Sequence, residues 1–151
     1  MSMKRIVRVA LVGAMVAAGL LAVQPSASAA PCVRISKIWY DSPGTDRGSN
    51  KSLNAEWVRL KNYCGTARSL KSWTIRDAKN HVYRFGTFRL GGGKSVTVHT
   101  GSGTNTAAHR YQGRDWYVWN NDKDTAYLKN ASGGLLDKCS YNNRNVDYVS
   151  C

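Results

Sequence analysis

The segment NAEWVRLKNYCGTARSLKSWTIRD, which runs from Asn54 to Asp77, contains two short runs of alternating apolar and polar residues. The first run covers residues 56–62 and the second covers residues 72–76. Side chains of a β-strand point alternately to its two faces, so each run predicts a strand that buries one face and exposes the other. The segment therefore favours a β fold.

Turn segments rich in glycine, proline, serine and asparagine separate further runs of the same kind. They include Ser42-Pro43-Gly44, the glycines at 91–93 and the loop at 101–105. No window places apolar residues at helical spacing over a length that predicts a helix. Seven strands are predicted, at Val33–Tyr40, Glu56–Asn62, Ser72–Arg76, Val82–Phe85, Ser95–Thr100, Ala126–Lys129 and Leu135–Tyr141. Seven short strands with such turns are typical of a β-sandwich.

The first 29 residues have the layout of a secretory signal peptide. Three basic residues precede an apolar run from Val9 to Val23, which is too short for a membrane span. Small residues at Ala27 and Ala29 suit signal peptidase, and we expect cleavage after Ala29. The sequence thus predicts a signal peptide at 1–29, one domain at 30–151, and a secreted, extracellular protein with no membrane span.

The chain is strongly basic, with 22 Lys and Arg residues against 9 Asp and Glu residues and a net charge of +13. The predicted leader holds three basic and no acidic residues, so the remaining 122 residues carry +10. This length suits one core. The charge predicts anionic partners, and the alternative explanation is that it keeps the protein in solution.

All four cysteines, Cys32, Cys64, Cys139 and Cys151, follow the predicted leader, and thiols of exported proteins are normally oxidised. No pair lies two to four residues apart, as a structural zinc site usually requires. Antiparallel pairing of the first two predicted strands places Cys32 beside Cys64, which leaves Cys139 for Cys151. Three connectivities remain possible from the sequence alone.

The combined strand and turn motifs resemble the lamin tail domain family. Beyond residues 54–77, the motifs that carry the resemblance are GGKSVTV (92–98), TGSG (100–103), WNN (119–121), DTAYLKN (124–130) and GLLD (134–137). The resemblance covers most of residues 33–141. It implies a disulfide-braced, immunoglobulin-like β-sandwich of the secreted bacterial type, which binds partners and has no catalytic residues to transfer.

Two positions depart from the family pattern. Ser72 and Asn80 stand where the family pattern has glycine. We expect local differences in the two turns and no change of fold.

The sequence offers no catalytic motif, and we predict a protein that is not an enzyme and has no cofactor. His81, His99 and His109 lack metal-binding spacing and are expected at the surface. Asp41 and Asp46 lie in a loop rich in oxygen ligands, which makes them a weak candidate for a metal site and for a metal-dependent nuclease. The loop matches no calcium-binding spacing, so capping of a turn is the preferred interpretation.

Three other acidic residues are expected to have structural roles. Asp77 and Asp124 stand where Asx turns are expected. Glu56 is expected to pair with a nearby base.

Aromatic and basic residues supply the candidate binding site. Trp73 alternates with Ile75 and is expected in the core. Trp57 shares a strand face with two basic residues, and further arginines take outward positions on other segments. The hypothesis is that Trp57, Arg59, Lys61, Arg76 and Arg84 form one basic surface that binds an extracellular polyanion, either nucleic acid such as DNA or an anionic cell-wall polymer. We expect the protein to act as a monomer.

The alternative function is a protein–protein interaction or inhibitory module that uses exposed aromatic side chains against an extracellular protein. Binding of that kind should be insensitive to salt, whereas polyanion binding weakens as salt rises. The sequence does not identify the ligand.

Overall fold

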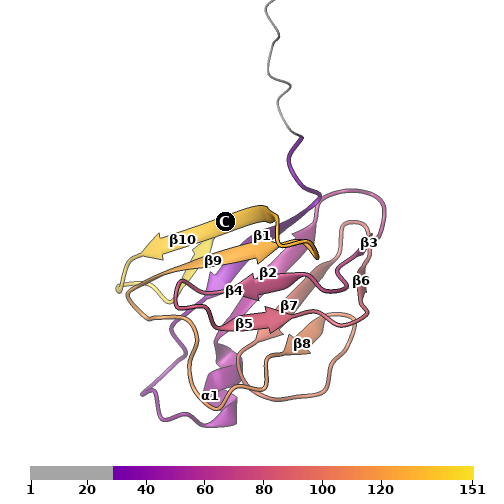
Figure 1. The fold of residues 1–151 in the computed structure, drawn as a ribbon. Helices are drawn as coiled ribbons and strands as arrows, with labels where there is room; N and C mark the ends of the chain where they lie inside the picture. The colour runs from indigo at the N-terminus through magenta and orange to yellow at the C-terminus, as the bar shows by residue number, and fades with distance from the viewer. Residues whose placement is uncertain (1–28) are drawn as a thin grey trace, which may run out of the picture.

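Two β-sheets pack face to face in the computed structural model, which describes residues 29–151 (Figure 1). The larger sheet has the order β11 (Tyr148–Ser150), β1 (Val33–Trp39), β2 (Trp57–Asn62), β7 (Ser95–His99) and β8 (His109–Tyr111). The smaller one has the order β10 (Leu135–Asn142), β9 (Lys123–Lys129), β4 (Thr74–Arg76) and β5 (Val82–Arg84). This is an immunoglobulin-like β-sandwich, as the sequence predicts. The predicted signal peptide lies outside the described residues, apart from Ala29.

Two short strands and a helix complete the described part of the chain. β3 (Arg68–Ser69) pairs with β6 (Arg89–Leu90) at one end of the sandwich. The single helix of this part, α1 (Asn50–Ala55), lies at the other end. Its first turn is capped by the Ser49 hydroxyl, which accepts a hydrogen bond from the Ser52 amide at 3.3 Å.

All seven predicted strands are present, and the largest difference in bounds is at β9, which begins three residues earlier than predicted. The sequence prediction missed α1, β3, β6, β8 and β11. The expectation of no helix is wrong because α1 has only six residues and one buried side chain, Leu53, which leaves no helical periodicity to detect.

Alternation along the strands builds the core between the two sheets. In β2, Val58 and Leu60 are fully buried, and in the facing sheet Ile75 and Leu128 are buried as well. Such burial stabilises the fold by about 1.5–3 kcal/mol for each large apolar side chain.

The tryptophan of the core is Trp119, which is 1% exposed. Trp73 is only partly buried and packs against the edge of the core. The expectation that Trp73 is a core residue is therefore only partly correct, because the side chain contacts the core without being fully buried. Trp119 lies outside regular secondary structure, where alternation gives no information about burial.

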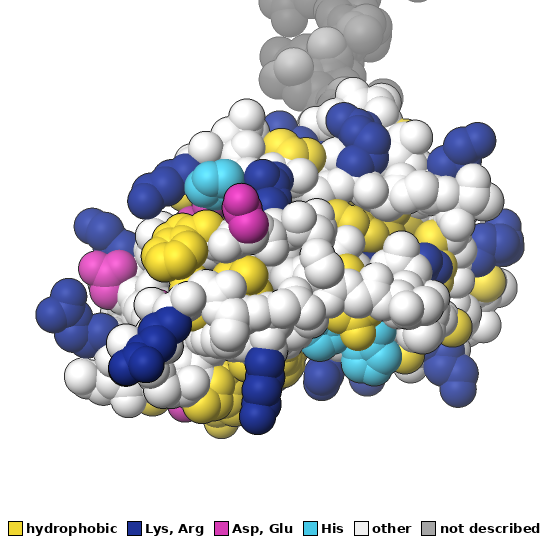
Figure 2. Space-filling model, turned by 90° about the horizontal axis from the view of Figure 1, so that it is seen from below, with side chains coloured by type: hydrophobic (Ala, Val, Ile, Leu, Met, Phe, Trp, Pro, Cys, Tyr) yellow, Lys and Arg dark blue, Asp and Glu magenta, His cyan; other side chains and the backbone are white. Residues whose placement is uncertain are grey.

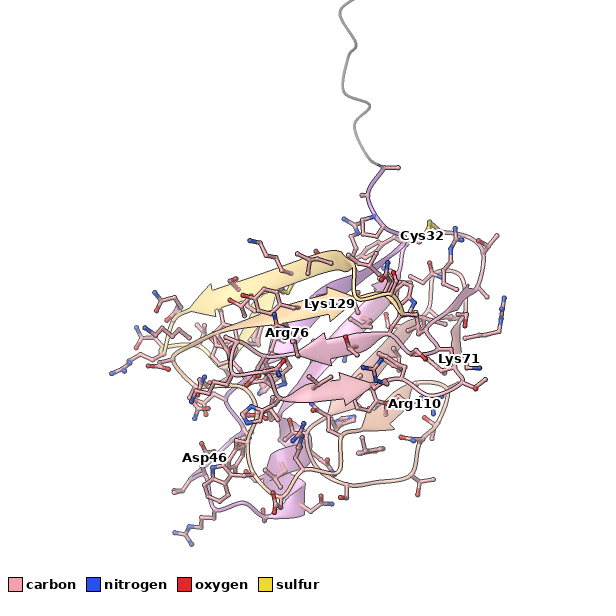
Figure 3. The ribbon with its side chains drawn as sticks, in the orientation of Figure 1. Cys32, Asp46, Lys71, Arg76, Arg110 and Lys129 are labelled. Atoms are coloured by element: carbon pink, nitrogen blue, oxygen red, sulfur yellow. A yellow bond between two sulfur atoms is a disulfide. The ribbon has the colours of Figure 1, made fainter. Side chains whose placement is uncertain are left out.

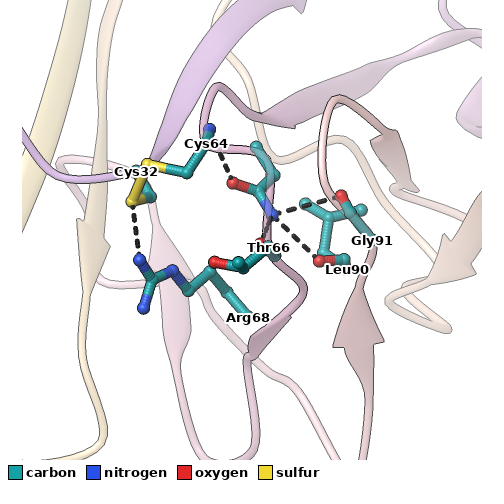
Figure 4. Close-up of a disulfide and its surroundings, with 7 residues drawn as sticks. Cys32, Cys64, Thr66, Arg68, Leu90 and Gly91 are labelled. Carbon is teal, nitrogen blue, oxygen red and sulfur yellow. Dashed lines mark hydrogen bonds between the residues drawn. A yellow bond between two sulfur atoms is a disulfide. The ribbon is translucent and has the colours of Figure 1, made fainter.

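A fully buried amide, that of Asn62, fixes the end of β2 (Figure 4). Its side-chain nitrogen donates to the carbonyl oxygens of Thr66, Leu90 and Gly91 at 2.8, 3.0 and 3.1 Å. Its side-chain oxygen accepts from the Cys64 amide at 3.1 Å. One side chain thus ties β2 to the turn that follows it and to the end of β6.

Glu56, which precedes β2, is fully buried and forms no ion pair with a basic side chain of residues 29–151, so the expected ion pair is wrong. Its Oε1 accepts hydrogen bonds from the Thr100 hydroxyl at 2.6 Å and from the Val118 amide at 2.8 Å. Burial raises the pKa of Glu56 to about 7; the hydrogen bonds oppose this shift, and the charge of Asp46 adds to it.

Asp77 and Asp124 both accept hydrogen bonds from backbone amides, but neither forms the predicted Asx turn, in which the amide two residues later would donate. The Asp77 carboxylate accepts from the His81 amide at 2.7 Å. The Asp124 carboxylate accepts from the amides of Ala78 and Thr125 at 3.0 and 2.7 Å. Both carboxylates are buried, and these bonds offset the cost of removing them from water.

Ser72 and Asn80 both have a left-handed backbone, with φ of 64° and 70°. This is the conformation that glycine adopts without strain. The turns thus keep a glycine-like backbone with side chains in place, which explains how the chain departs from the family pattern at these two positions without changing the fold.

Two disulfides join Cys32 to Cys64 and Cys139 to Cys151, the pairs expected from the strand order. The first bridge links the start of β1 to the residues after β2, and the Arg68 guanidinium donates to the Cys32 sulfur at 3.1 Å (Figure 4). The second bridge holds the end of β11 against β10.

We predict that the second bridge orders β11. Replacing Cys139 and Cys151 by serine should lower the free energy of unfolding by about 3 kcal/mol, because the unfolded chain gains loop entropy. It should also remove the protection of the β11 amides in hydrogen exchange. Loss of the Cys32–Cys64 bridge should cost about 4 kcal/mol and leave native β11 amides protected. Unchanged β11 protection without Cys139 and Cys151 would contradict the prediction.

A second prediction concerns Glu56. Burial raises its pKa from 4.5 to about 7, so the native state retains a proton that the unfolded chain releases between these values. The stabilisation is complete below pH 4.5 and is lost as the pH rises through about 7. Glu56→Gln keeps the acceptor oxygen and cannot ionise. Urea unfolding should therefore show the parent losing about 3 kcal/mol relative to this variant between acidic and mildly basic pH. A parallel pH dependence of the two proteins would refute the assignment.

Candidate functional site

The outer face of the five-stranded sheet carries four basic side chains, and no carboxylate occupies an outward position in its described strands. The strand register places Lys37 beside Arg59 and Arg34 beside Lys61. The four cations of this face, named here the basic face, are Arg34, Lys37, Arg59 and Lys61. Two adjacent strands, β1 and β2, thus supply all of them.

Five rings form a row across the same face, one from each strand. In sheet order they are Tyr148, Trp39, Trp57, His99 and Tyr111. Ring centroids lie 5.1 Å apart for Trp39 and Tyr148, 5.9 Å for Trp39 and Trp57, and 5.0 Å for His99 and Tyr111. Contacts of this kind between cross-strand neighbours stabilise a sheet and hold its side chains in place.

Two cations of the basic face lie over rings of this row. The Lys37 ammonium is 3.6 Å from the centroid of Tyr148, and the Arg59 guanidinium is 4.6 Å from that of Trp57. Arg59 also donates from Nε to the Thr97 hydroxyl at 3.2 Å. The attraction of each cation to its ring fixes the position of the charge at the surface.

The other two cations share a second ring. The Arg34 guanidinium lies 4.1 Å from the centroid of Tyr63, and the Lys61 ammonium lies 5.1 Å from it. Tyr63 is 47% exposed, so this group is open to solvent. All four cations of the basic face therefore lie against aromatic rings, and none belongs to a salt bridge of the described residues.

His99 and His109 form a pair at the β7–β8 side of the face. His99 Nδ1 lies 2.7 Å from the Asn54 carbonyl oxygen, which can only accept, so this nitrogen carries a hydrogen. His99 Nε2 lies 2.9 Å from His109 Nδ1. Burial lowers the pKa of His99, the Asn54 bond opposes this shift, and the charges of His109 and Arg59 reinforce it. His99 is therefore half-buried and tied to a neighbour, unlike the ordinary surface histidine expected from the sequence.

Arg76 and Arg84 lie in the other sheet, in its strands β4 and β5. Figure 3 labels Arg76 there. The structure thus does not join all five predicted residues into one surface. Trp57, Arg59 and Lys61 share the basic face, and the two arginines do not. Alternation tells which face of its own strand a residue occupies, but not which sheet the strand joins.

Comparison with known protein families gives a match to the lamin tail domain over residues 26–143. The chain belongs to this family. The lamin tail domain is an immunoglobulin-like domain without a family-wide catalytic site, which agrees with the sandwich seen here. No curated protein sequence matches the chain. Family membership therefore establishes the fold and leaves the ligand open.

Sequence reasoning did not place Arg34 and Lys37 in the site of this lamin tail domain. The sequence could have indicated them, because both residues belong to a predicted strand that was also expected to pair with the strand at 56–62. The bulge between Ile35 and Lys37 interrupts the alternation of β1 and hides the outward position of Lys37.

Asp41 and Asp46 lie in the loop between β1 and α1, and Figure 3 labels Asp46 there. Asp41 follows β1 closely, and its carbonyl oxygen accepts a hydrogen bond from Trp39 Nε1 at 2.9 Å. Both carboxylates accept from the Asn121 side-chain nitrogen, at 3.1 and 3.0 Å, and Asp46 also accepts from the Ser42 hydroxyl at 3.3 Å. Burial raises the pKa of Asp41, with further contributions from Asp46 and Asp147. Within the described residues, no three His, Cys, Asp or Glu side chains are grouped so that they could hold a metal ion.

The basic residues spread widely over the surface of this domain. Figure 2 views the end that carries α1 and shows Lys and Arg side chains around its outline, with few acidic ones between them. No helix in the described part of the chain is both long and apolar enough to cross a membrane.

The histidine pair gives a prediction. His99 should titrate below its usual pKa of 6.5, because burial and neighbouring charges disfavour its protonated form. NMR titration of the His99 ring signals should show this lowered pKa. The substitution His109→Ala should raise the titration midpoint of His99, because it removes a ring that buries His99 and a neighbouring charge. A His99 midpoint at or above 6.5 would exclude the described environment.

Proposed function

We propose that this domain is a secreted, monomeric binding module that holds extracellular polyanions on its basic face. The observation that carries the proposal is the set of four cations on adjacent strands, with neither a carboxylate on the face nor a salt bridge to any of them in the described residues. Unpaired surface cations attract phosphate and carboxylate polymers and release their counterions on binding.

Order within the face supports the same proposal. Lys and Arg side chains lose much rotational freedom when they bind, which weakens binding. Rings already restrain the cations of the basic face, for example Lys37 over Tyr148 and Arg34 over Tyr63. The face should therefore lose less entropy on binding than a surface of free lysines.

The opposite sheet fits this role less well. Arg76 donates to the Asp77 carbonyl oxygen at 3.1 Å, and Arg84 donates to that of Ser72 at 3.0 Å. Arg59 makes an internal bond as well, so the difference between the sheets lies in the register. Arg76 lies opposite Val82 and Arg84 opposite Thr74, so neither has a cation as its cross-strand neighbour, whereas Lys37 lies opposite Arg59. Arg76 and Arg84 add to the overall positive field without forming the contact surface.

The compartment is part of the proposal. Two disulfides and the signal-peptide layout of residues 1–29 support export. Outside the cell, DNA and anionic wall polymers are the polyanions that such a face would meet.

The test compares charge-matched double variants of the two sheets. Lys37→Gln with Arg59→Gln should weaken binding of a single-stranded DNA oligonucleotide by about 10-fold or more at about 50 mM salt, and should lower the salt slope by about 1.5. Arg76→Gln with Arg84→Gln removes the same charge and should weaken binding by no more than about 3-fold. Fluorescence anisotropy at several salt concentrations, repeated with an anionic wall polymer, gives these values.

Equal losses in the two double variants would show that net charge, and not the basic face, controls binding. Absence of binding to both polymers at low salt would reject the proposed function altogether. Binding that persists unchanged up to about 200 mM salt would favour the alternative of a protein partner held by aromatic side chains.

A further inference from the structure

A pocket of about 430 Å³ lies at the end of the sandwich that carries α1, away from the basic face. The loop before α1 and residues 114–121 form much of its wall. The side chains that matter below are Asp46, Lys79, His81, Arg114, Asp115 and Trp116. Its volume is within the range of small-molecule sites.

Trp116 supplies an exposed ring that is nevertheless held in place. It is 60% exposed, the largest such fraction among the large hydrophobic side chains of the described chain. The indole packs on the backbone of Gly48, where an added Cβ would lie 2.8 Å from Cζ3. The neighbouring ring of Tyr117 meets it edge-on at 5.4 Å, and the Tyr117 hydroxyl bonds to that of Ser52 at 2.6 Å. A rigid, exposed aromatic ring is a ready platform for a flat ligand.

Three polar side chains of the pocket are also held in position by hydrogen bonds to residues around it. His81 Nδ1 lies 2.6 Å from the fully buried Asp77 carboxylate, which leaves Nε2 for a ligand. Arg114 donates to the Val82 carbonyl oxygen at 3.1 Å. Asp46 is held by the Asn121 amide at 3.0 Å. Fixed donors and acceptors of this kind reduce the entropy lost on binding.

Trp119 adds an independent observation at the same place. It also lines the pocket and is 1% exposed, and its indole N–H has no hydrogen-bond partner among the described residues. A buried donor without a partner is costly, and such groups often mark ligand sites.

The charges of the pocket balance. Lys79 and Arg114 supply two cations, and Asp46 and Asp115 supply two carboxylates. A polyanion would meet the carboxylates, and a purely apolar ligand would leave the polar groups without partners. Hydroxyl groups both donate and accept, so a polyhydroxylated neutral ring satisfies both kinds of group while an apolar face lies on Trp116.

We propose that this pocket binds a neutral saccharide, one hexopyranose unit of a polysaccharide. The proposal does not depend on polyanion binding, because the two sites share no residue. The domain would thus hold two chemically different extracellular polymers at separate places.

The experiment titrates the protein with two neutral probes, cellotetraose and tetra-N-acetylchitotetraose, followed by the indole N–H signals in NMR. At least one probe should shift the Trp116 signal with saturation. Trp116→Ala should weaken that binding by about 10-fold or more, as measured by calorimetry. Asp46→Ala provides a second variant and should weaken binding by about 3-fold or more. Leu135→Ala, an apolar change at a similarly exposed position at the far end of β10, should leave this binding unaltered.

Several outcomes would overturn the proposal. They are the absence of any Trp116 shift with both probes, unchanged affinity in a folded Trp116→Ala protein, and competition between DNA and the saccharide. The double variant Lys37→Gln with Arg59→Gln should still bind the saccharide, so failure of the basic face and failure of the pocket can be told apart.

Discussion

Both ends of β2 are fixed by a fully buried polar side chain, Glu56 at its start and Asn62 at its end. Glu56 accepts hydrogen bonds from segments distant in sequence, and Asn62 donates hydrogen bonds to another such segment. These bonds hold loops at the two ends of the sandwich in place relative to β2. A buried polar group without partners destabilises a fold, whereas one with partners specifies a single arrangement. The position of β2, and with it the outward positions of the basic face, depends on these two side chains.

The distribution of charge follows from the same arrangement. Carboxylates that the fold needs are buried as acceptors, as in Glu56, Asp77 and Asp124. Others gather in loops near α1, where Asp41 and Asp46 share one amide. The described strands of the five-stranded sheet therefore present cations and no carboxylate on their outer face, while the end with the pocket keeps charges of both signs.

Much of the sandwich could be predicted because long strands bury alternate side chains, as Val58 and Leu60 do. Strands such as β3 and β11 could not, since they are two or three residues long, largely exposed, and exist only through partners far along the chain. Of the basic face, the sequence predicted the residues of β2 and missed those of β1. Arg76 alternates as Arg59 does, and only the sheet topology separates them. The pocket around Trp116 lies in irregular segments, where no periodicity marks it.

The pairing of β1 with β11 has a consequence for how the chain acquires its structure. Lys37 lies opposite Ser150, so the sheet is completed by contacts between segments more than a hundred residues apart. Contacts so distant in sequence raise the contact order, and domains of this kind fold in milliseconds to seconds. During synthesis, β1 has no partner on this edge until residue 150 has emerged, so the edge stays open to other strands until then.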